Sequence, residues 1–448
     1  MPELLLQSLP YCRDSRSLMQ ALAVLPHPVF LDSGLASAAE SRYDILSAAP
    51  TRFDCMTADV FSRCSELLQD ARPSQAELQQ LSHLPFCGGL LGCIAYDAGL
   101  GIAKIDGSRS GDADVQPLLN LPVAAVGIYD WAVVVDHQQQ KTELFILPGC
   151  PEKIRQDVLS VMSSVPEETP ARFGLVSPFT ALDSREHYLA AFRRLQDYIL
   201  NGHCYQTNLA MAFSAEFSGS TLDAFQLLRQ RSRSPFSAYI DAGDFQLLSL
   251  SPERFISVRD RQVFTQPIKG TRKRYADPEL DQASINDLLS SEKDRAENLM
   301  IVDLLRNDLG TLCETGSVKT GSLFALHSFS QVHHLISSIS GRLPQHISPL
   351  QLLDRCFPGG SITGAPKVRA MQIINELERI PRAFYCGSVF YNDYLDRLDS
   401  NICIRTLLAN QNHLYCWGGS GVVADSEAEL EYQECLDKVS ALMDLPGI

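Results

Sequence analysis

Strand-forming runs joined by very short turns constrain the fold of this chain more than any other feature. The runs LLSLSPERFISV and QVFTQPI flank a turn at residues 259–261, which predicts an antiparallel hairpin. Other strand-type runs occur at residues 208–217, 238–251 and 400–418, with helical patterns between them. The sequence therefore predicts an α/β chain with much antiparallel pairing and helices near residues 184–202, 223–232, 294–309, 349–356, 367–378 and 427–443.

The length of the chain indicates two domains or one large two-lobed domain. Its 448 residues exceed the roughly 250–300 at which a single hydrophobic core usually stops growing. Residues 163–177 are rich in proline, serine and charge, and we interpret them as a connector. We expect an amino-terminal region at residues 1–165 and a second region, which carries the sharper motifs, at residues 185–445.

Composition narrows the class of protein. A net charge of −15 argues against nucleic acid and anionic lipid as partners, because both would need a basic surface. A small anionic substrate stays possible, since a few local cations can outweigh a distant global charge. No apolar run approaches the ~18 residues that span a bilayer, and the start MPELLLQSLPYCRD lacks a basic segment, so we expect a cytoplasmic protein.

The pattern of the thirteen cysteines also indicates the cytoplasm, where thiols stay reduced. They are scattered singly through apolar segments and form no C-x-x-C pair. We expect free, buried thiols.

The predicted hairpin brings an acid near a lysine. Pairing about the turn places Glu253 opposite Ile268, so Lys269 lies one residue away from the acid across the ladder. A one-residue slip or a bulge would let the two side chains share a site. A surface ion pair on the hairpin is the alternative.

Two later helices carry acids on their inner faces. Glu297 shares its helix face with Met300, Ile301, Leu304 and Leu305, and an inward carboxylate must be protonated, paired or bound to a metal. Ser426 and Glu429 suggest a capping box at the start of the last helix. On the inner face of this helix, three charged side chains lie within about 60° of one another on the helical wheel: Glu431, Glu434 and Lys438.

Oxygen ligands from two helices, without histidine or thiolate spacing, suit a hard cation such as Mg²⁺. An ion-pair cluster around Lys438 is the alternative.

Other segments suggest binding of an anion. The turn WGGSG at residues 417–421 could offer successive backbone amides to a carboxylate or phosphate. Arg405 follows Ile404 on an apolar strand, a position from which a guanidinium can bind a carboxylate.

His334 alone would be interpreted as a core histidine. The segment PGGSITGAPK is not a P-loop, because Ala365 and Pro366 occupy the positions where that motif requires Gly-Lys.

Together these motifs resemble the chorismate-utilising enzymes, which include the anthranilate, isochorismate and salicylate synthases. The chain is similar to that family, in the family's order over about residues 185–445, in SPERF, PIKGT, AENLMIVDLLRNDL, VHHLISS, GGSITGAPK, CIRT, GGSGVVADS and EYQECLDK. FLDSG and GGLLGCIAYD resemble the amino-terminal part of the amine-adding members. The resemblance implies the fold of anthranilate synthase component I, with two packed antiparallel sheets and helices on the outside.

The resemblance also implies roles for single residues. Glu297 and Glu434, with Glu431 nearby, resemble ligands of a Mg²⁺ ion that clamps the ring carboxylate of chorismate. Glu253 resembles the general acid for the departing C4 hydroxyl, and Lys269 the nucleophile. His334 and Thr271 resemble further residues of the catalytic pocket. The groups that would hold the anionic substrate are Arg405, Lys438, Gly270 and the backbone amides of Gly419, Ser420 and Gly421.

Lys269 decides the expected product. Anthranilate synthases resemble this chain but have alanine at this position, and isochorismate and salicylate synthases place a lysine where this chain has Gln206. We therefore expect a transferase of the transaminase class that converts chorismate and ammonia to 4-amino-4-deoxychorismate, on the route to 4-aminobenzoate and folate. The amine would attack C2, and ammonia would then add at C4 and expel the lysine. Anthranilate formation is the alternative within the enzymes, and an inactive chorismate-binding regulator is the alternative outside them.

Ammonia implies a separate glutaminase subunit as partner, as in the family, because no glutaminase domain fits in this length. Ser33 lies where anthranilate synthases carry a tryptophan-sensing motif, so the resemblance implies a possible amino-acid pocket there. Only the leucine and the serine of that motif match, at Leu31 and Ser33.

Overall fold

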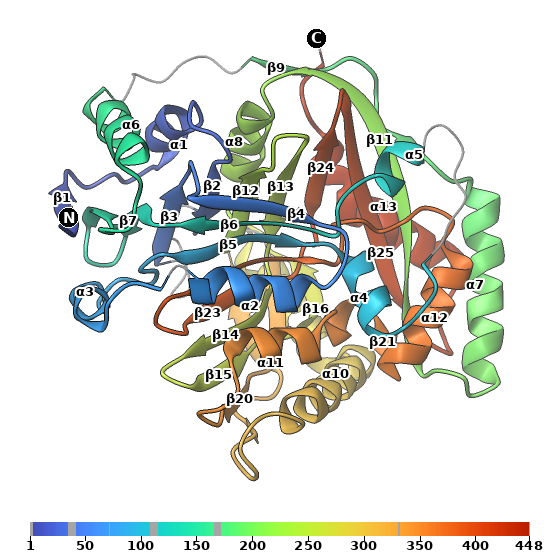
Figure 1. The fold of residues 1–448 in the computed structure, drawn as a ribbon. Helices are drawn as coiled ribbons and strands as arrows, with labels where there is room; N and C mark the ends of the chain where they lie inside the picture. The colour runs from blue at the N-terminus through green and yellow to red at the C-terminus, as the bar shows by residue number, and fades with distance from the viewer. Residues whose placement is uncertain are drawn as a thin grey trace.

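The computed structural model describes residues 3–34, 42–70, 72–107, 115–164, 172–329 and 332–447. Within these residues the strands form three antiparallel sheets, and most helices lie on the outside (Figure 1). The predicted α/β class with antiparallel sheets is therefore confirmed. Residues 165–171 of the predicted connector lie outside the described residues, and the division at 1–165 and 185–445 stays a prediction.

The largest sheet draws its strands from both ends of the chain. Among the described residues it has thirteen strands, and β2 pairs with β12 near its middle, with Leu31 opposite Ala238. The main path runs β1 (Leu5–Leu9), β8 (Lys141–Ile146), β7 (Trp131–Asp136), β3 (Tyr43–Ser47), β2 (Val29–Asp32), β12 (Phe236–Asp241), β13 (Phe245–Ser251), β24 (Thr406–Asn410), β25 (His413–Val422), β11 (Gln206–Gly219) and β10 (Thr180–Ala181). The short strands β9 (Phe173–Leu175) and β21 (Gly364–Ala365) also pair with β11.

The second sheet contains the predicted hairpin. It has nine strands in the described part of the chain, in the order β17 (Lys319–Thr320), β20 (Ile339–Arg342), β15 (Gln262–Thr265), β14 (Arg254–Arg259), β23 (Leu398–Asn401), β22 (Ser388–Asp393), β5 (Gly89–Ile94), β6 (Ala124–Tyr129) and β4 (Arg52–Met56). The chain then forms a small third sheet, whose first strand comes directly after β15. Its strand order is β16 (Ile268–Lys273), β19 (Val332–Ile336) and β18 (Ala325–Ser328).

Neighbouring residues of one strand serve two different cores. On β13, Leu247 belongs to the apolar cluster that also contains Phe86, whereas Leu248 belongs to the cluster that also contains Phe192. This follows from the strand period of two, which sends successive side chains to opposite faces. The large sheet is therefore buried on both faces, against the second sheet on one and against the helices α1 (Arg16–Leu22), α7 (Arg185–Leu200) and α8 (Thr221–Ser232) on the other.

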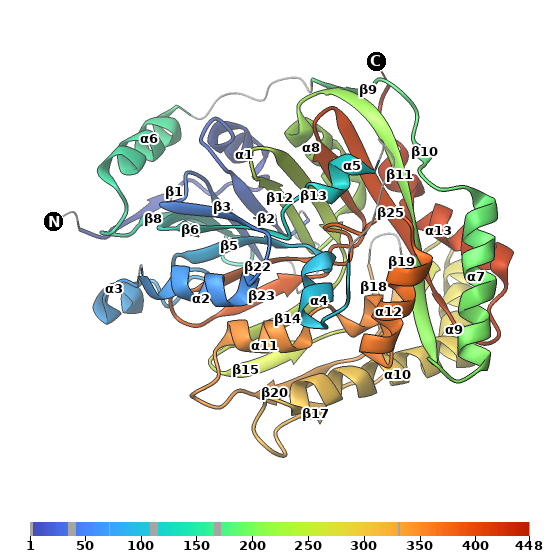
Figure 2. The same ribbon diagram turned by 45° about the vertical axis from the view of Figure 1, so that its right-hand side comes forward.

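The predicted helices are present. Figure 2 shows the small sheet on the same side of the molecule as α9 (Pro278–Ser290), α10 (Glu292–Gly310) and α12 (Lys367–Leu377). Helix α9 was not predicted, although Asp277 caps it and Pro278 begins it. The remaining helices are α2 (Val60–Asp70), α3 (Gln75–Gln80), α4 (Tyr96–Ile102), α5 (Gln116–Leu119), α6 (Glu152–Ser163), α11 (Pro349–Cys356) and α13 (Ala428–Met443).

Two details of the sequence interpretation are corrected. Ser426 does not form a capping box with Glu429, because Glu427 is the N-cap residue of α13 and the Ser426 hydroxyl donates to Glu431 instead. The cysteines are free, as predicted, but Cys55 is exposed and Cys12 is only half-buried. None of the described helices is long and apolar enough to cross a membrane.

Candidate active site

A cavity of about 630 Å³ lies where the ends of β16, β19 and β25 meet α10 and α13. It brings together residues from segments that are almost two hundred positions apart in the chain. Twelve of the fourteen predicted site residues line it: Glu253, Lys269, Gly270, Thr271, Glu297, His334, Arg405, Gly419, Gly421, Glu431, Glu434 and Lys438. Ser420 and Ser33 lie elsewhere.

The hairpin has the predicted register. Asp260 and Arg261 form its turn with φ values of 51° and 65°, the left-handed region that two-residue hairpin turns require. Val258 pairs with Val263, and continuing this register places Glu253 opposite Ile268. The Ile268 amide donates a hydrogen bond to the Glu253 carboxylate, which keeps the two segments together beyond the end of the ladder.

Lys269 leaves the hairpin and enters the small sheet. It pairs with Leu335 of β19, and the register shifts between Lys269 and Thr271. Gly270 lies at this irregularity with a φ of 76°, which favours glycine. The Lys269 Nζ donates to the backbone carbonyl of Ser361 at 3.3 Å, so the ammonium or amine lies inside the cavity rather than in bulk solvent.

Glu253 has the environment of a general acid. Burial raises its pKa to about 7, and the positive charge of Lys269 and a hydrogen bond from the Ser361 hydroxyl at 2.9 Å only partly oppose that effect. A carboxyl group with this pKa is partly protonated near neutral pH, so it can donate a proton to a leaving group.

His334 is held as a neutral ring. Its Nδ1 lies 2.9 Å from the Thr271 hydroxyl. Burial lowers its pKa to about 4, and the nearby charge of Arg405 acts in the same direction. The histidine is therefore a hydrogen-bonding wall of the cavity at neutral pH and carries no charge there.

The predicted acids Glu297, Glu431 and Glu434 line the same cavity. Burial raises the pKa of Glu297, and the charges of Asp294 and Glu434 add to this effect, which shows that negative groups gather here. Glu434 pairs with Lys438 at 2.6 Å. The Oε1 of Glu431 accepts from Ser426, whereas its Oε2 is buried without a partner.

In the described residues no cluster of three or more histidine, cysteine or acidic side chains is arranged to hold a metal ion. The donor set nevertheless fits Mg²⁺ chemically, because it consists of carboxylates, one of which has an unsatisfied buried oxygen. The magnesium site stays a prediction.

Arg405 is the strongest sign of an anionic ligand. It lies in a bend before β24, with a φ of 50°, and not within the strand as predicted. Burial lowers the pKa of its guanidinium, and no carboxylate of the described residues pairs with it. A buried charge without a partner is costly, so a negative group is expected to bind there when the site is filled.

In the segment Gly419–Gly421, two backbone amides and not three are free to bind an anion. It is the end of β25 and not a turn, since Gly421 pairs with Asn208 and Gly419 pairs with Ala210 on β11. The amides of Asn208 and Ala210 bond away from β25, so by the alternation of an antiparallel ladder the amides of both glycines point away from β11. The amide of Ser420 points toward β11, and the structure therefore removes it from the predicted group.

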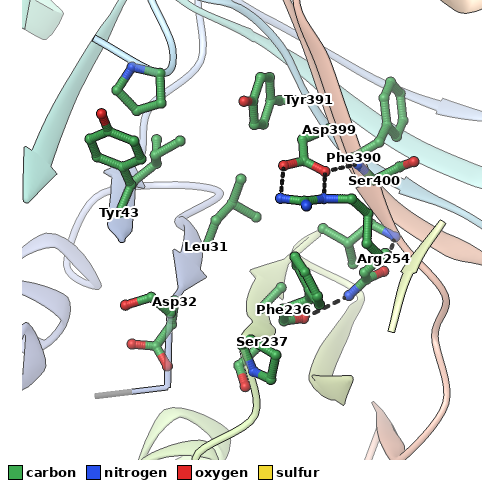
Figure 3. A pocket seen from close by; sticks show the side chains of 17 residues that line it. Leu31, Asp32, Tyr43, Phe236, Ser237, Arg254, Phe390, Tyr391, Asp399 and Ser400 are labelled. Carbon is green, nitrogen blue, oxygen red and sulfur yellow. Dashed lines mark hydrogen bonds and ion pairs between the residues drawn. The ribbon is translucent and has the colours of Figure 1, made fainter. Parts of the chain in front are cut away.

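Ser33 belongs to a second, smaller cavity of about 120 Å³. Figure 3 shows this cavity, where Arg254 forms two bonds with Asp399 beside the ring of Phe236. The Ser33 hydroxyl donates to Asp44 at 2.6 Å. Binding of an amino acid there stays a prediction.

Sequence reasoning missed Ser361. It lies on the short 3-10 turn Gly360–Ile362 and contacts both Glu253 and Lys269. The segment GGSITGAPK that contains it is one of the motifs shared with the family, but the sequence alone indicated no role for its serine. Its repeated glycines, which allow close packing, were the signal that could have found it.

The chain belongs to the chorismate binding enzymes, whose family model matches residues 29–444. It is 44% identical to aminodeoxychorismate synthase component 1 of Klebsiella aerogenes, over 97% of each chain, and 42% identical to that of Escherichia coli (strain K12), over 94% of each. Anthranilate synthase component I from Streptococcus pneumoniae has a similar structure, with a TM-score of 0.78, 28% identity and coverage of 91% of this chain and 93% of that one.

Proposed function

We propose that this protein is component 1 of an aminodeoxychorismate synthase and converts chorismate and ammonia to 4-amino-4-deoxychorismate. The observation that carries the proposal is the position of Lys269, an amine inside the cavity beside the buried acid Glu253. Relatives named for this activity are 44% and 42% identical over nearly the whole chain. The reaction transfers an amino group, so we assign the protein to the transaminase class.

The substrate is a dianion, and the cavity offers groups that suit it. Arg405 would pair with one carboxylate, and Gly419, Gly421 and Lys438 line the same cavity. A guanidinium and backbone amides hold a carboxylate by fixed hydrogen bonds. These groups would orient the ring so that its C4 hydroxyl faces Glu253.

The chemistry follows in two displacements. The neutral Lys269 amine forms a bond to C2, both conjugated ring double bonds shift by one position, to C1=C6 and C4=C5, and the C4–O bond breaks as Glu253 gives its proton to the departing oxygen. Ammonia then forms a bond to C4, the two double bonds shift back, and the bond between C2 and the lysine nitrogen breaks. The ammonium formed at C4 returns one proton to Glu253, so water and 4-amino-4-deoxychorismate are the products, and both Lys269 and Glu253 are regenerated.

Glu297, Glu434 and Glu431 would hold a Mg²⁺ ion. When bound, such an ion supplies positive charge that neutralises a substrate carboxylate. Arg405 and Lys438 would hold the substrate through their own positive charges, independently of the metal ion.

We further propose that ammonia comes from a separate glutaminase subunit, because the names of the relatives call them component 1. The product would feed 4-aminobenzoate and folate synthesis in the cytoplasm.

Product identification tests the function. The purified chain is incubated with chorismate, ammonium at high pH and Mg²⁺, and the products are separated and weighed by mass spectrometry. We expect non-aromatic aminodeoxychorismate. Fluorescent anthranilate would contradict the proposal and support the alternative activity.

A further inference from the structure

The segment Pro358–Lys367 lies against the cavity, and one of its residues touches both of the proposed reacting groups. The Ser361 hydroxyl donates to Glu253 Oε1 at 2.9 Å. The backbone carbonyl of the same residue accepts from Lys269 Nζ at 3.3 Å. Ser361 thus contacts both the acid and the amine.

The backbone around Ser361 is fixed from several sides. The Thr363 hydroxyl donates to the Gly359 carbonyl at 2.9 Å and closes the turn. The fully buried Arg382 donates to the Ile362 carbonyl at 3.0 Å. Because its neighbours on both sides are held, Ser361 can present its groups with little freedom.

The same turn is packed against the helix that carries Glu297. A Cβ on Gly360 would lie 2.5 Å from a methyl group of Leu304 on α10. Any other residue at this position would require the Leu304 side chain to move. Gly360 therefore lets the Ser361 turn pack closely against α10, the helix that also carries Glu297.

We propose that Ser361 is a positioning residue that orients Glu253 and Lys269 for the two displacements; this inference rests on the proposed function. Its hydroxyl engages Oε1 of the acid, so the transferable proton resides on Oε2. Its carbonyl can only accept a hydrogen bond, so it holds the amine through an N–H and leaves the nitrogen lone pair free to attack.

The charged and titratable groups that face Glu253 limit what else could position it. These are the cations of Lys269 and Lys438 and the thiol of Cys386. Lys269 is the amine itself, and in the described part of the chain neither Lys438 nor Cys386 is hydrogen-bonded to both groups, as Ser361 is.

The test is the pH profile of kcat/KM for chorismate with ammonia in Ser361→Ala. The lost hydroxyl stabilises the ionised form of Glu253, so its removal should move the alkaline limb to higher pH by about one unit. We expect kcat to fall about tenfold, with KM within about twofold of the parent value. Ser361→Thr keeps the hydroxyl and should restore the original limb.

A matched control is Ser400→Ala. Ser400 is buried, whereas Ser361 is half-buried, and the Ser400 hydroxyl donates to the Ile256 carbonyl at 2.7 Å, away from the larger cavity. It should lower the melting temperature without moving the limb. An alkaline limb at the same pH in Ser361→Ala and the parent enzyme would overturn the proposal.

A second variant covers the case in which Ser361→Ala does not fold. Ser361→Cys keeps nearly the same volume but offers only a weak donor, so the same shift of the limb is expected. Failure of the proposed function would look different. The parent enzyme would then yield anthranilate or form no adduct at Lys269, whatever the profile of the serine variants.

Discussion

The two cavities differ in how completely their charges are matched. In the larger one, Arg405 has no acid partner within the described residues and Glu431 Oε2 has no hydrogen bond. In the smaller one, Arg254 forms two bonds with Asp399 at 2.9 and 3.1 Å (Figure 3). Charged groups without partners are costly inside a protein, so they persist where a ligand completes them. The larger cavity is incomplete without an anion, whereas the charges of the smaller one already satisfy each other.

The largest expected effect is the loss of the nucleophile in Lys269→Ala. Turnover with ammonia should fall by about 10³-fold or more, because the covalent route is closed. Intact-mass measurement with chorismate should show an adduct on the parent enzyme and none on the variant. Lys293→Ala at the exposed mouth of the same cavity is the control and should retain the adduct. An adduct that persists on another residue would remove Lys269 from this role.

The next effect concerns the acids of the incomplete cavity. Glu297→Gln should lower turnover by about 10²-fold and make it insensitive to added Mg²⁺, because one carboxylate ligand is lost. Asp303→Asn, on the exposed face of the same helix, should leave the dependence on Mg²⁺ unchanged. If Glu297→Gln responds to Mg²⁺ like the parent enzyme, the metal site does not include this residue.

A direct comparison of the cavities uses one arginine from each. Arg405→Ala should raise KM for chorismate about 10²-fold without loss of stability, since a buried, unmatched cation is removed. Arg254→Ala should leave KM unchanged and lower the free energy of unfolding by about 1–3 kcal/mol, because Asp399 loses its partner. Steady-state kinetics and urea denaturation measure the two quantities. The reverse pattern would exchange the roles assigned to the cavities.

The smallest expected effect is a pH-dependent gain in stability when Glu253 is replaced by glutamine. The pKa of Glu253 is raised above its unfolded value, so its contribution to stability is fully present below about pH 4.5 and is lost as the pH rises through about 7. Glu253→Gln should therefore match the parent enzyme at pH 4 and be more stable at pH 8, by on the order of 2 kcal/mol. Thermal melts at both values check this. Equal melting temperatures at pH 8 would show that burial does not disfavour the ionised acid.

Local patterns predicted the features that depend on neighbouring residues. A tight turn fixes the register of a hairpin, so Glu253 could be placed opposite Ile268 from sequence alone. Helical spacing likewise placed Glu297 and Glu431 on inner faces, and both line the cavity.

Features that depend on distant contacts were missed or wrong. Arg405 lies at a positive φ that the apolar run around it does not suggest. The Ser426 hydroxyl was expected to cap a helix, but Glu431 competes for it. Ser361 acquires its partners only because Leu304 and Arg382 approach its turn from other parts of the chain. Such choices are made by tertiary packing, which a single local motif does not contain.

The pairing of β2 with β12 has a consequence for how the chain can be divided. A protease that cuts between residues 164 and 172 would leave the two pieces joined, because the ladder from Val29 to Asp32 continues to hold them. If the piece that follows the cut were expressed alone, the edge of β12 at Ser237–Ile240 would have no partner strand. Unpaired edges recruit other chains, so that piece is expected to aggregate unless the earlier piece is supplied with it.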